Sequence, residues 1–324
     1  MRWLNPRVLA MFALFALLTA LLSATPVAAR MGGGSAGSVA GVDARTLYDR
    51  VHFLGASASA GFGVRAPLPS GHPGRSQAMP LSRIATAARL QPCTVTGDAT
   101  SLFFTNPIAT GSAQVNAVLA AAQKPTLVIG VDCLFWYVYG ALDADRARIK
   151  DESQRMAMLE VGLANLDRIV KANTPVVVGD FPNMSDAVGK MLSPSQMPAL
   201  ETLDAANKRL RAWAAERPLV TIVPLAALVK QLDSGEPFQA GNRTWSSKAD
   251  GPLIQADRLH PTFAGSVALL ARTEQSASEH FRKGEAPGLT PAAMEHDPVK
   301  VGATARANIE AEIARRSVPA GEPR

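Results

Sequence analysis

The 324-residue chain contains little cysteine and few aromatic residues. Its two cysteines, Cys93 and Cys133, form neither a Cys-x-x-Cys pair nor a zinc-binding pattern. Two cysteines can pair in an oxidising compartment, but sequence separation alone does not show that they meet. Two small, half-buried side chains are the simpler interpretation. The sequence therefore indicates no metal site.

Dense clusters of basic residues are also missing. The chain has 33 basic and 27 acidic residues, a formal charge of +6, and they are scattered along its length. A dispersed positive charge of this size favours solubility and argues against a nucleic-acid partner.

The amino-terminal end has the features of a secretory signal over residues 1–29. Arg2 and Arg7 precede an apolar run at 8–24, and small residues follow at 27–29. The run is shorter than the roughly 20 residues that a spanning helix needs. We expect an exported, periplasmic or extracellular protein with no stable membrane insertion once the signal is cleaved. An uncleaved amino-terminal anchor is the alternative.

Composition divides the rest of the chain into three parts. Residues 30–46 are rich in Gly, Ser and Ala and are expected to form a flexible linker. Residues 47–283 carry the alternating pattern of a folded domain. Residues 284–324 are polar and interrupted by proline, so we expect a tail with one short helix near 303–316.

Short apolar runs alternate with helical periodicity within 47–283. The expected strands are 51–54, 93–96, 126–131, 175–179 and 219–223. The expected helices are 151–172 and 199–215, with shorter ones near 80–90, 112–122 and 262–282. Strands without polar alternation are typical of parallel sheets covered on both faces. The pattern predicts an α/β domain, with functional groups just beyond the carboxyl ends of its strands.

The first expected strand leads directly into residues 55–61, GASASAG. Small residues around Ser57 permit a sharp turn and leave the hydroxyl accessible to a substrate. A serine capping a helix explains the segment equally well. A phosphate-binding P-loop is excluded because it requires a lysine, and a Gly-x-Ser-x-Gly elbow because Ser59 stands where its second glycine belongs.

A second candidate segment is residues 257–260, DRLH. A carboxylate three residues before a histidine can bond one imidazole nitrogen and leave the other free to act as a base. An Asp–His pair that caps the next helix is the alternative. Of the five histidines, only His260 combines a carboxylate partner with a strand-to-helix junction.

Two further segments follow the second and third expected strands. Gly97 can bring its N–H close to an oxyanion, or can belong to an ordinary turn. Asp132 stands at the end of 129–132.

Taken together, and in their order along the chain, the four segments resemble the SGNH/GDSL hydrolase family over about residues 48–282. Residues 55–61 are similar to its Gly-Asp-Ser-Leu-Ser-x-Gly block, and Gly97 to its second-block glycine. Residues 130–133 stand where the family has Gly-x-Asn-Asp, and 257–260 match its Asp-x-x-His, including the Pro261 that follows.

The resemblance implies a flavodoxin-like three-layer α/β/α sandwich with a five-stranded parallel sheet in the order 2-1-3-4-5. It also implies that Ser57 is the nucleophile, His260 its base and Asp257 the residue that orients His260. The N–H groups of Ser57 and Gly97 would hold the oxyanion. No metal and no cofactor is implied.

Two residues depart from the family pattern. Ala56 replaces an aspartate, a change that we expect to affect the local support of this segment and not the chemistry. Asp132 replaces an asparagine that supplies a third oxyanion donor, whereas an ionised carboxylate only accepts hydrogen bonds. Asp132 either stays protonated and donates, or turns away and holds the serine loop.

An aromatic cluster follows Asp132 at 134–140, LFWYVYG. Phe135 and Trp136 either form the wall of a substrate pocket or pack into the core at a helix start.

We therefore predict an exported serine esterase that acts on a small-molecule or polysaccharide ester through an acyl-enzyme. Two alternatives use the same fold. One is an O-acyltransferase or deacetylase of envelope polysaccharide. The other is a catalytically idle binding protein, which the aspartate at position 132 would favour.

Overall fold

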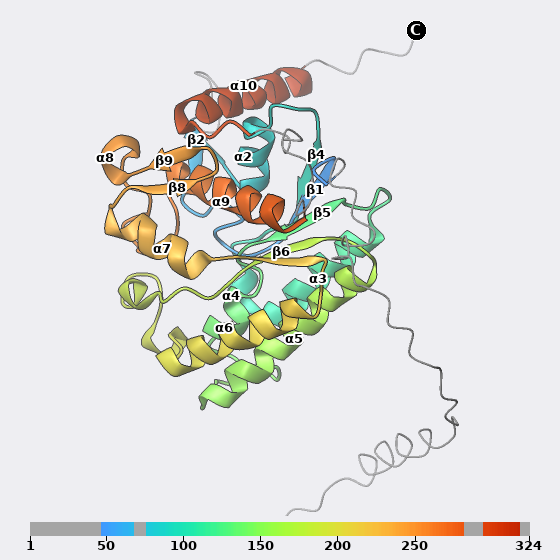
Figure 1. Cartoon of the computed structure of the whole chain (residues 1–324), viewed down its shortest axis with the longest axis vertical. Helices are drawn as coiled ribbons and strands as arrows, with labels where there is room; N and C mark the ends of the chain where they lie inside the picture. Colours follow the sequence, from blue (N-terminus) through green and yellow to red (C-terminus); the bar gives the residue numbers. More distant parts are fainter. Residues whose placement is uncertain (1–46, 68–75, 282–293, 318–324) are drawn as a thin grey trace, which may run out of the picture. The chain divides into compact units, whose positions relative to one another are not determined.

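Five parallel strands form the central sheet of the computed structural model, which describes residues 47–67, 76–281 and 294–317 (Figure 1). The strands are β1 (Arg50–Phe53), β4 (Thr94–Gly97), β5 (Leu127–Gly130), β6 (Val176–Gly179) and β7 (Val220–Val223). They lie in the order β4-β1-β5-β6-β7. Counted along the chain within this sheet, that order is 2-1-3-4-5, as predicted.

The strand sequences account for their positions in the sheet. Every residue of β5 (LVIG) and β6 (VVVG) is buried, and these strands lie in the interior of the sheet. Strand β4 (TVTG) is largely exposed and lies at one edge. β-Branched side chains without polar alternation suit strands that are covered on both faces.

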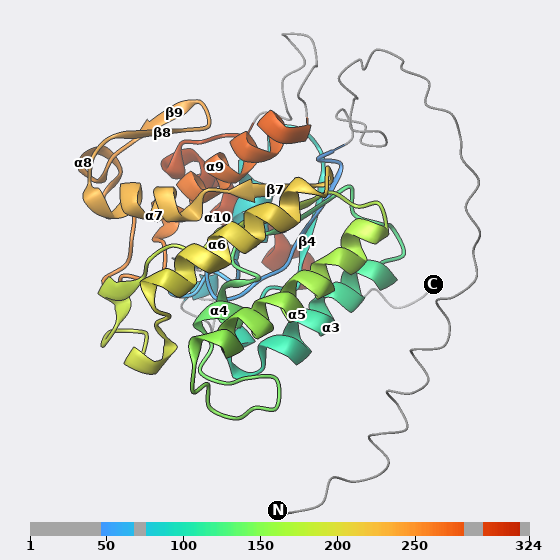
Figure 2. The same ribbon diagram turned by 60° about the horizontal axis from the view of Figure 1, so that its bottom comes forward.

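Helices cover both faces of the sheet, giving the predicted three-layer sandwich (Figures 1 and 2). One face packs against α2 (Leu81–Ala88), α7 (Leu225–Ser234), α9 (Phe263–Phe281) and α10 (Pro298–Ser317). The opposite face packs against α3 (Pro107–Ala120), α4 (Phe135–Tyr139), α5 (Glu152–Lys171) and α6 (Leu200–Ala215).

Local signals set the starts of the long helices. Asp151 accepts hydrogen bonds from the backbone of Ser153 and Gln154, and the Gln154 side chain reaches back to complete a capping box at α5. Helix α3 begins with Pro107, and the side chain of Asn106 accepts the N–H of Ala109.

Several short elements were not predicted. Two antiparallel pairs lie outside the main sheet, and their strands have only three residues each. These elements are β2 (Arg65–Pro67), β3 (Ser76–Ala78), β8 (Phe238–Ala240), β9 (Arg243–Trp245), α8 (Ser247–Asp250), η1 (Phe103–Thr105), η2 (Ser185–Ala187) and η3 (Pro194–Gln196). Runs this short carry too few side chains to establish a period.

The carboxyl-terminal segment differs from the expected polar tail. Helix α10 runs from Pro298 to Ser317, longer than the expected 303–316, and packs on α2. Its Val301, Ala305 and Ile309 are almost completely buried in the core shared with α2 and α9. The apolar residues at spacings of four form one buried stripe, so this part of the expected tail belongs to the fold.

The other predictions concern the two cysteines and the amino-terminal residues 1–46. Cys93 is partly exposed and Cys133 is buried, and they do not pair. The expected signal at 1–29 and linker at 30–46 lie outside the described residues. Within the described ranges, no helix is both long and apolar enough to cross a bilayer.

Candidate active site

Ser57 lies on a tight turn just beyond the carboxyl end of β1. Gly55 begins the turn with a φ of +138°, a conformation that side chains rarely adopt. A Cβ at Gly55 would also overlap Asp132 Oδ1. The turn closes with hydrogen bonds from the Ala60 N–H to the Ala56 carbonyl (2.8 Å) and from the Phe62 N–H to the Ser57 carbonyl (2.9 Å). These contacts leave Ser57 half-buried at the sheet edge.

The turn at 257–260 precedes α9 and organises an aspartate around a histidine. Asp257 Oδ1 accepts the backbone N–H groups of Leu259 and His260, each at 3.0 Å. Its other oxygen lies 2.8 Å from His260 Nδ1. Burial pushes the pKa of the Asp257 carboxyl upward, but the hydrogen bonds from His260 and Leu259 outweigh it and hold the pKa below its usual value.

Ser57 and His260, 203 positions apart in sequence, meet at the sheet edge. Ser57 Oγ lies 2.8 Å from His260 Nε2, and only 2% of His260 is exposed. With Nδ1–H donating to Asp257, Nε2 carries the lone pair that accepts the Ser57 hydroxyl. Hydroxyl, imidazole and carboxylate thus lie in line and can pass one proton from the alcohol to the ring.

Asp132 follows β5 and points toward the Ser57 turn. Its Oδ1 accepts the Ala56 N–H (3.0 Å) and the Ser59 hydroxyl (2.5 Å). Its Oδ2 accepts the N–H groups of Ala58 (2.9 Å) and Ser59 (3.1 Å). Four donors converge on this carboxylate, so its oxygens act as acceptors that hold the turn. Asp132 thus holds the serine loop, which is the second of its two expected roles.

Gly97 ends β4, beside Phe53 of β1. A Cβ at Gly97 would lie 2.9 Å from the Phe53 carbonyl oxygen, so the position requires the close backbone approach of a glycine. Gly97 is not among the residues that line the pocket at Ser57. It borders a separate hollow between α2 and α10, together with Ser82 and Arg83.

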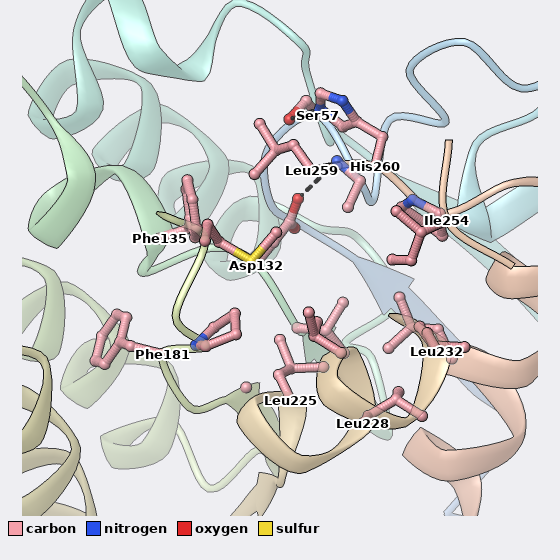
Figure 3. A pocket seen from close by; sticks show the side chains of 18 of the residues that line it. Ser57, Asp132, Phe135, Phe181, Leu225, Leu228, Leu232, Ile254, Leu259 and His260 are labelled. Carbon is pink, nitrogen blue, oxygen red and sulfur yellow. Dashed lines mark hydrogen bonds between the residues drawn. The ribbon is translucent and has the colours of Figure 1, made fainter. Parts of the chain in front are cut away.

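The two predicted aromatic residues have different surroundings. Phe135 lines the pocket that contains Ser57 and His260 (Figure 3). Trp136 does not line that pocket. It is 5% exposed and packs against the rings of Phe104 and Phe135, with ring centroids 5.6 Å and 5.1 Å apart. The wall interpretation thus fits Phe135, and the packing interpretation fits Trp136.

Two glutamines that the sequence analysis missed hold the site together. Gln114, on α3, accepts the Gly55 N–H and donates to the carbonyls of Gly55 and Asp98, all within 2.9 Å. Gln255 donates to the carbonyls of Phe62 (2.8 Å) and Pro261 (2.7 Å), which joins the serine turn to the histidine turn. Neither has a local sequence signature, because each acts on loops far along the chain.

Phe62 was also missed, and it covers the histidine. Its ring lies 4.4 Å from the His260 ring at an interplanar angle of 31°. Phe62 is 38% exposed, so it forms the outer boundary of the site above His260. Among the described residues, no group of three or more His, Cys, Asp or Glu side chains is arranged to hold a metal ion.

Comparisons with known proteins give distant similarities to solved structures, among them a drug-metabolizing enzyme and a candidate acylhydrolase. No protein-family profile and no curated protein matches the chain. It is similar to a gut microbial diltiazem-metabolizing enzyme at 15% identity and a TM-score of 0.42, over 71% of this chain and 46% of that one. It is also similar to a candidate acylhydrolase of Bacteroides fragilis at 14% identity and a TM-score of 0.41, over 71% of this chain and 86% of that one. The chain thus spans less than half of the first structure.

Proposed function

We propose that the protein is a serine hydrolase that cleaves an ester through a covalent acyl-enzyme. The observation that carries the proposal is the continuous array Ser57 Oγ–His260 Nε2 and His260 Nδ1–Asp257 Oδ2, with 2.8 Å at each contact. These are the distances at which a nucleophile, its base and an orienting carboxylate share hydrogen bonds.

In the first half of the reaction, Ser57 Oγ attacks the ester carbonyl carbon while His260 Nε2 takes the hydroxyl proton. The carbonyl oxygen becomes an oxyanion. As the intermediate collapses, the C–O bond to the alcohol breaks and the imidazolium gives its proton to the leaving oxygen. In the second half, His260 Nε2 takes a proton from water as the water oxygen attacks the acyl carbon. The bond between that carbon and Ser57 Oγ then breaks, the imidazolium returns its proton to Oγ, and the carboxylic acid leaves.

In this proposal, Asp257 stabilises the imidazolium and the N–H group of Ser57 holds the oxyanion. Gly97, expected to supply a second N–H, lies outside the pocket and has no part in the proposal. Asp132 is an anchor of the nucleophile turn and not an oxyanion donor, because its oxygens already accept four hydrogen bonds. The loss of one donor typically costs about 10²–10³ in rate, so we expect a modest kcat.

The test combines a covalent probe with two substitutions. A fluorophosphonate should label wild-type protein at Ser57, and Ser57→Ala should abolish both labelling and hydrolysis of p-nitrophenyl esters. His260→Ala should do the same while the circular dichroism spectrum stays unchanged. An unlabelled Ser57 in folded wild-type protein would instead identify an idle binding protein.

Export through residues 1–29 and the choice of acceptor belong to the same proposal. Water as acceptor gives a hydrolase, and a sugar hydroxyl would give an acyltransferase on the same residues. Product analysis with and without a soluble polysaccharide separates the two, because transfer would leave the acyl group on the sugar.

A further inference from the structure

The pocket at Ser57 extends along the carboxyl ends of β5 and β6 to α7. Ser57 and His260 lie at one end, and Leu225, Leu228 and Leu232 lie toward the other (Figure 3). The cavity has a volume of about 70 Å³. Leu228 and Leu232 are at most 5% exposed and belong to the core, whereas Leu225 and Val229 are half-buried.

Away from the Ser57 end, the walls are apolar except for Asp180. Four lining residues are polar: Ser57, Asp132, Asp180 and His260. The carboxylate of Asp132 is occupied by the serine turn. Asp180 accepts the Ala226 N–H at 2.7 Å and so faces the start of α7. A ligand that fills this space must therefore have a polar group near Ser57 and an apolar remainder.

The inner part of the pocket follows one face of a helix. Leu225, Leu228, Val229 and Leu232 recur at helical spacing and all line the cavity. From Leu225 to Leu232 the helix rises about 10 Å. A straight acyl chain would extend along this stripe.

We propose, on the basis of the serine hydrolase function above, that this pocket binds the acyl chain of the substrate and selects longer straight acyl groups over acetyl. The acyl group stays bonded to Ser57 while the alcohol leaves and water enters. Contacts with the leucine side chains of this pocket can hold the acyl group through both half-reactions. An acetyl group would leave the leucine-lined part unfilled.

The experiment compares p-nitrophenyl esters from acetate to dodecanoate. We expect kcat/KM to rise about fourfold per methylene, the value of burying one such group, until the pocket is full. A profile that is flat or highest at acetate would overturn the proposal. So would acetate esters of longer alcohols reproducing the same rise, because that result would place the alcohol in the pocket.

Two opposite changes at Leu228 assign the effect to this pocket. Leu228→Trp should lower the octanoate-to-acetate ratio of kcat/KM by about tenfold or more. Leu228→Ala should move the optimum toward longer chains. Leu200→Trp is the matched control, because Leu200 is 60% exposed on α6, and its ratio should equal that of wild type. Misfolding lowers all rates together and cannot shift the two profiles in opposite directions. Equal ratios in all variants would overturn the proposal.

A binding measurement separates failure of the pocket from failure of the proposed function. If the fluorophosphonate does not label Ser57, the hydrolase function fails, but calorimetry can still compare octanoate with acetate. Tighter binding of octanoate that Leu228→Trp abolishes would support the apolar pocket. If the probe labels Ser57 but chain length has no effect, the hydrolase function stands and the acyl pocket fails.

Discussion

The hydroxyl of Ser59 donates a 2.5 Å hydrogen bond to Asp132 Oδ1, directly beneath the turn that carries Ser57. Both residues are buried, at 0% and 9% exposure. Three backbone N–H groups complete the set of donors to this carboxylate. An asparagine at position 132 has one acceptor oxygen where the aspartate has two, so the two side chains are not equivalent here.

Asp132→Asn should therefore destabilise the protein without raising its activity. The amide NH₂ would face N–H groups and leave buried donors unsatisfied, at a cost of about 1–3 kcal/mol. Denaturant unfolding and p-nitrophenyl ester hydrolysis measure the two effects. A variant that gained activity at unchanged stability would show that the side chain acts as an oxyanion donor.

The stability contributed by Asp257 should depend on pH. Its pKa is lower in the folded protein than the ordinary value of an aspartate, 3.8. The folded state therefore binds this proton less readily, and the contribution is present above that value and is lost as pH falls through the folded pKa. The stability difference between wild type and Asp257→Asn should be constant from about pH 5 upward and shrink below about pH 4. A difference that grew on acidification would contradict the assignment.

Gly55→Ala should be far more harmful than alanine at another left-handed glycine. Gly55 has a φ of +138° and no room for a Cβ beside Asp132. Gly189 is the matched control, with a φ of +79° and nothing within 4 Å of a Cβ. The control should lose about 1 kcal/mol from backbone strain alone. Gly55→Ala should lose several kcal/mol, together with esterase activity. Similar losses at both positions, measured by urea unfolding, would rule out a tight serine turn.

Helix α10 should be required for the stability of the whole domain. Ile309→Ala removes a side chain that is 1% exposed and should cost about 2–5 kcal/mol. Val299→Ala, on the same helix, changes a side chain that is 77% exposed and should cost almost nothing. Thermal unfolding compares the two. Equal melting temperatures would indicate that the segment is a dispensable tail.

The sheet could be predicted because its five strands are short, apolar runs between helical segments. Each end of an expected strand lies within one residue of the corresponding end of the observed strand. Helix α7 has the spacing to be found as well, with Leu225, Leu228 and Leu232 on one face and Gly235 in the left-handed conformation at its end. It was missed although those signals are in the sequence.

Ser57 could be chosen because parallel strands bring their carboxyl ends to one edge. Asp257 and His260 could be chosen because their spacing of three residues lets a carboxylate bond an imidazole. The contacts of Gln114 and Gln255 could not be predicted, because each joins residues far apart in the sequence. Gln114 bonds Gly55, 59 positions away, and Gln255 bonds Phe62, 193 positions away. The orientation of Asp132 depends on where four donors of the serine turn lie, and that geometry exists only in the folded chain. The sequence also does not show that Phe135 lines the pocket while Trp136 packs away from it, because the place of Trp136 depends on its contact with Phe104.

The base and the nucleophile lie on opposite sides of the sequence, and α9 and α10 follow the base. A nascent chain therefore has its reactive alcohol long before it has an imidazole to activate it. In the proposed hydrolase, ester hydrolysis would therefore report completed folding, because a molecule in which α9 has not docked has no base in place.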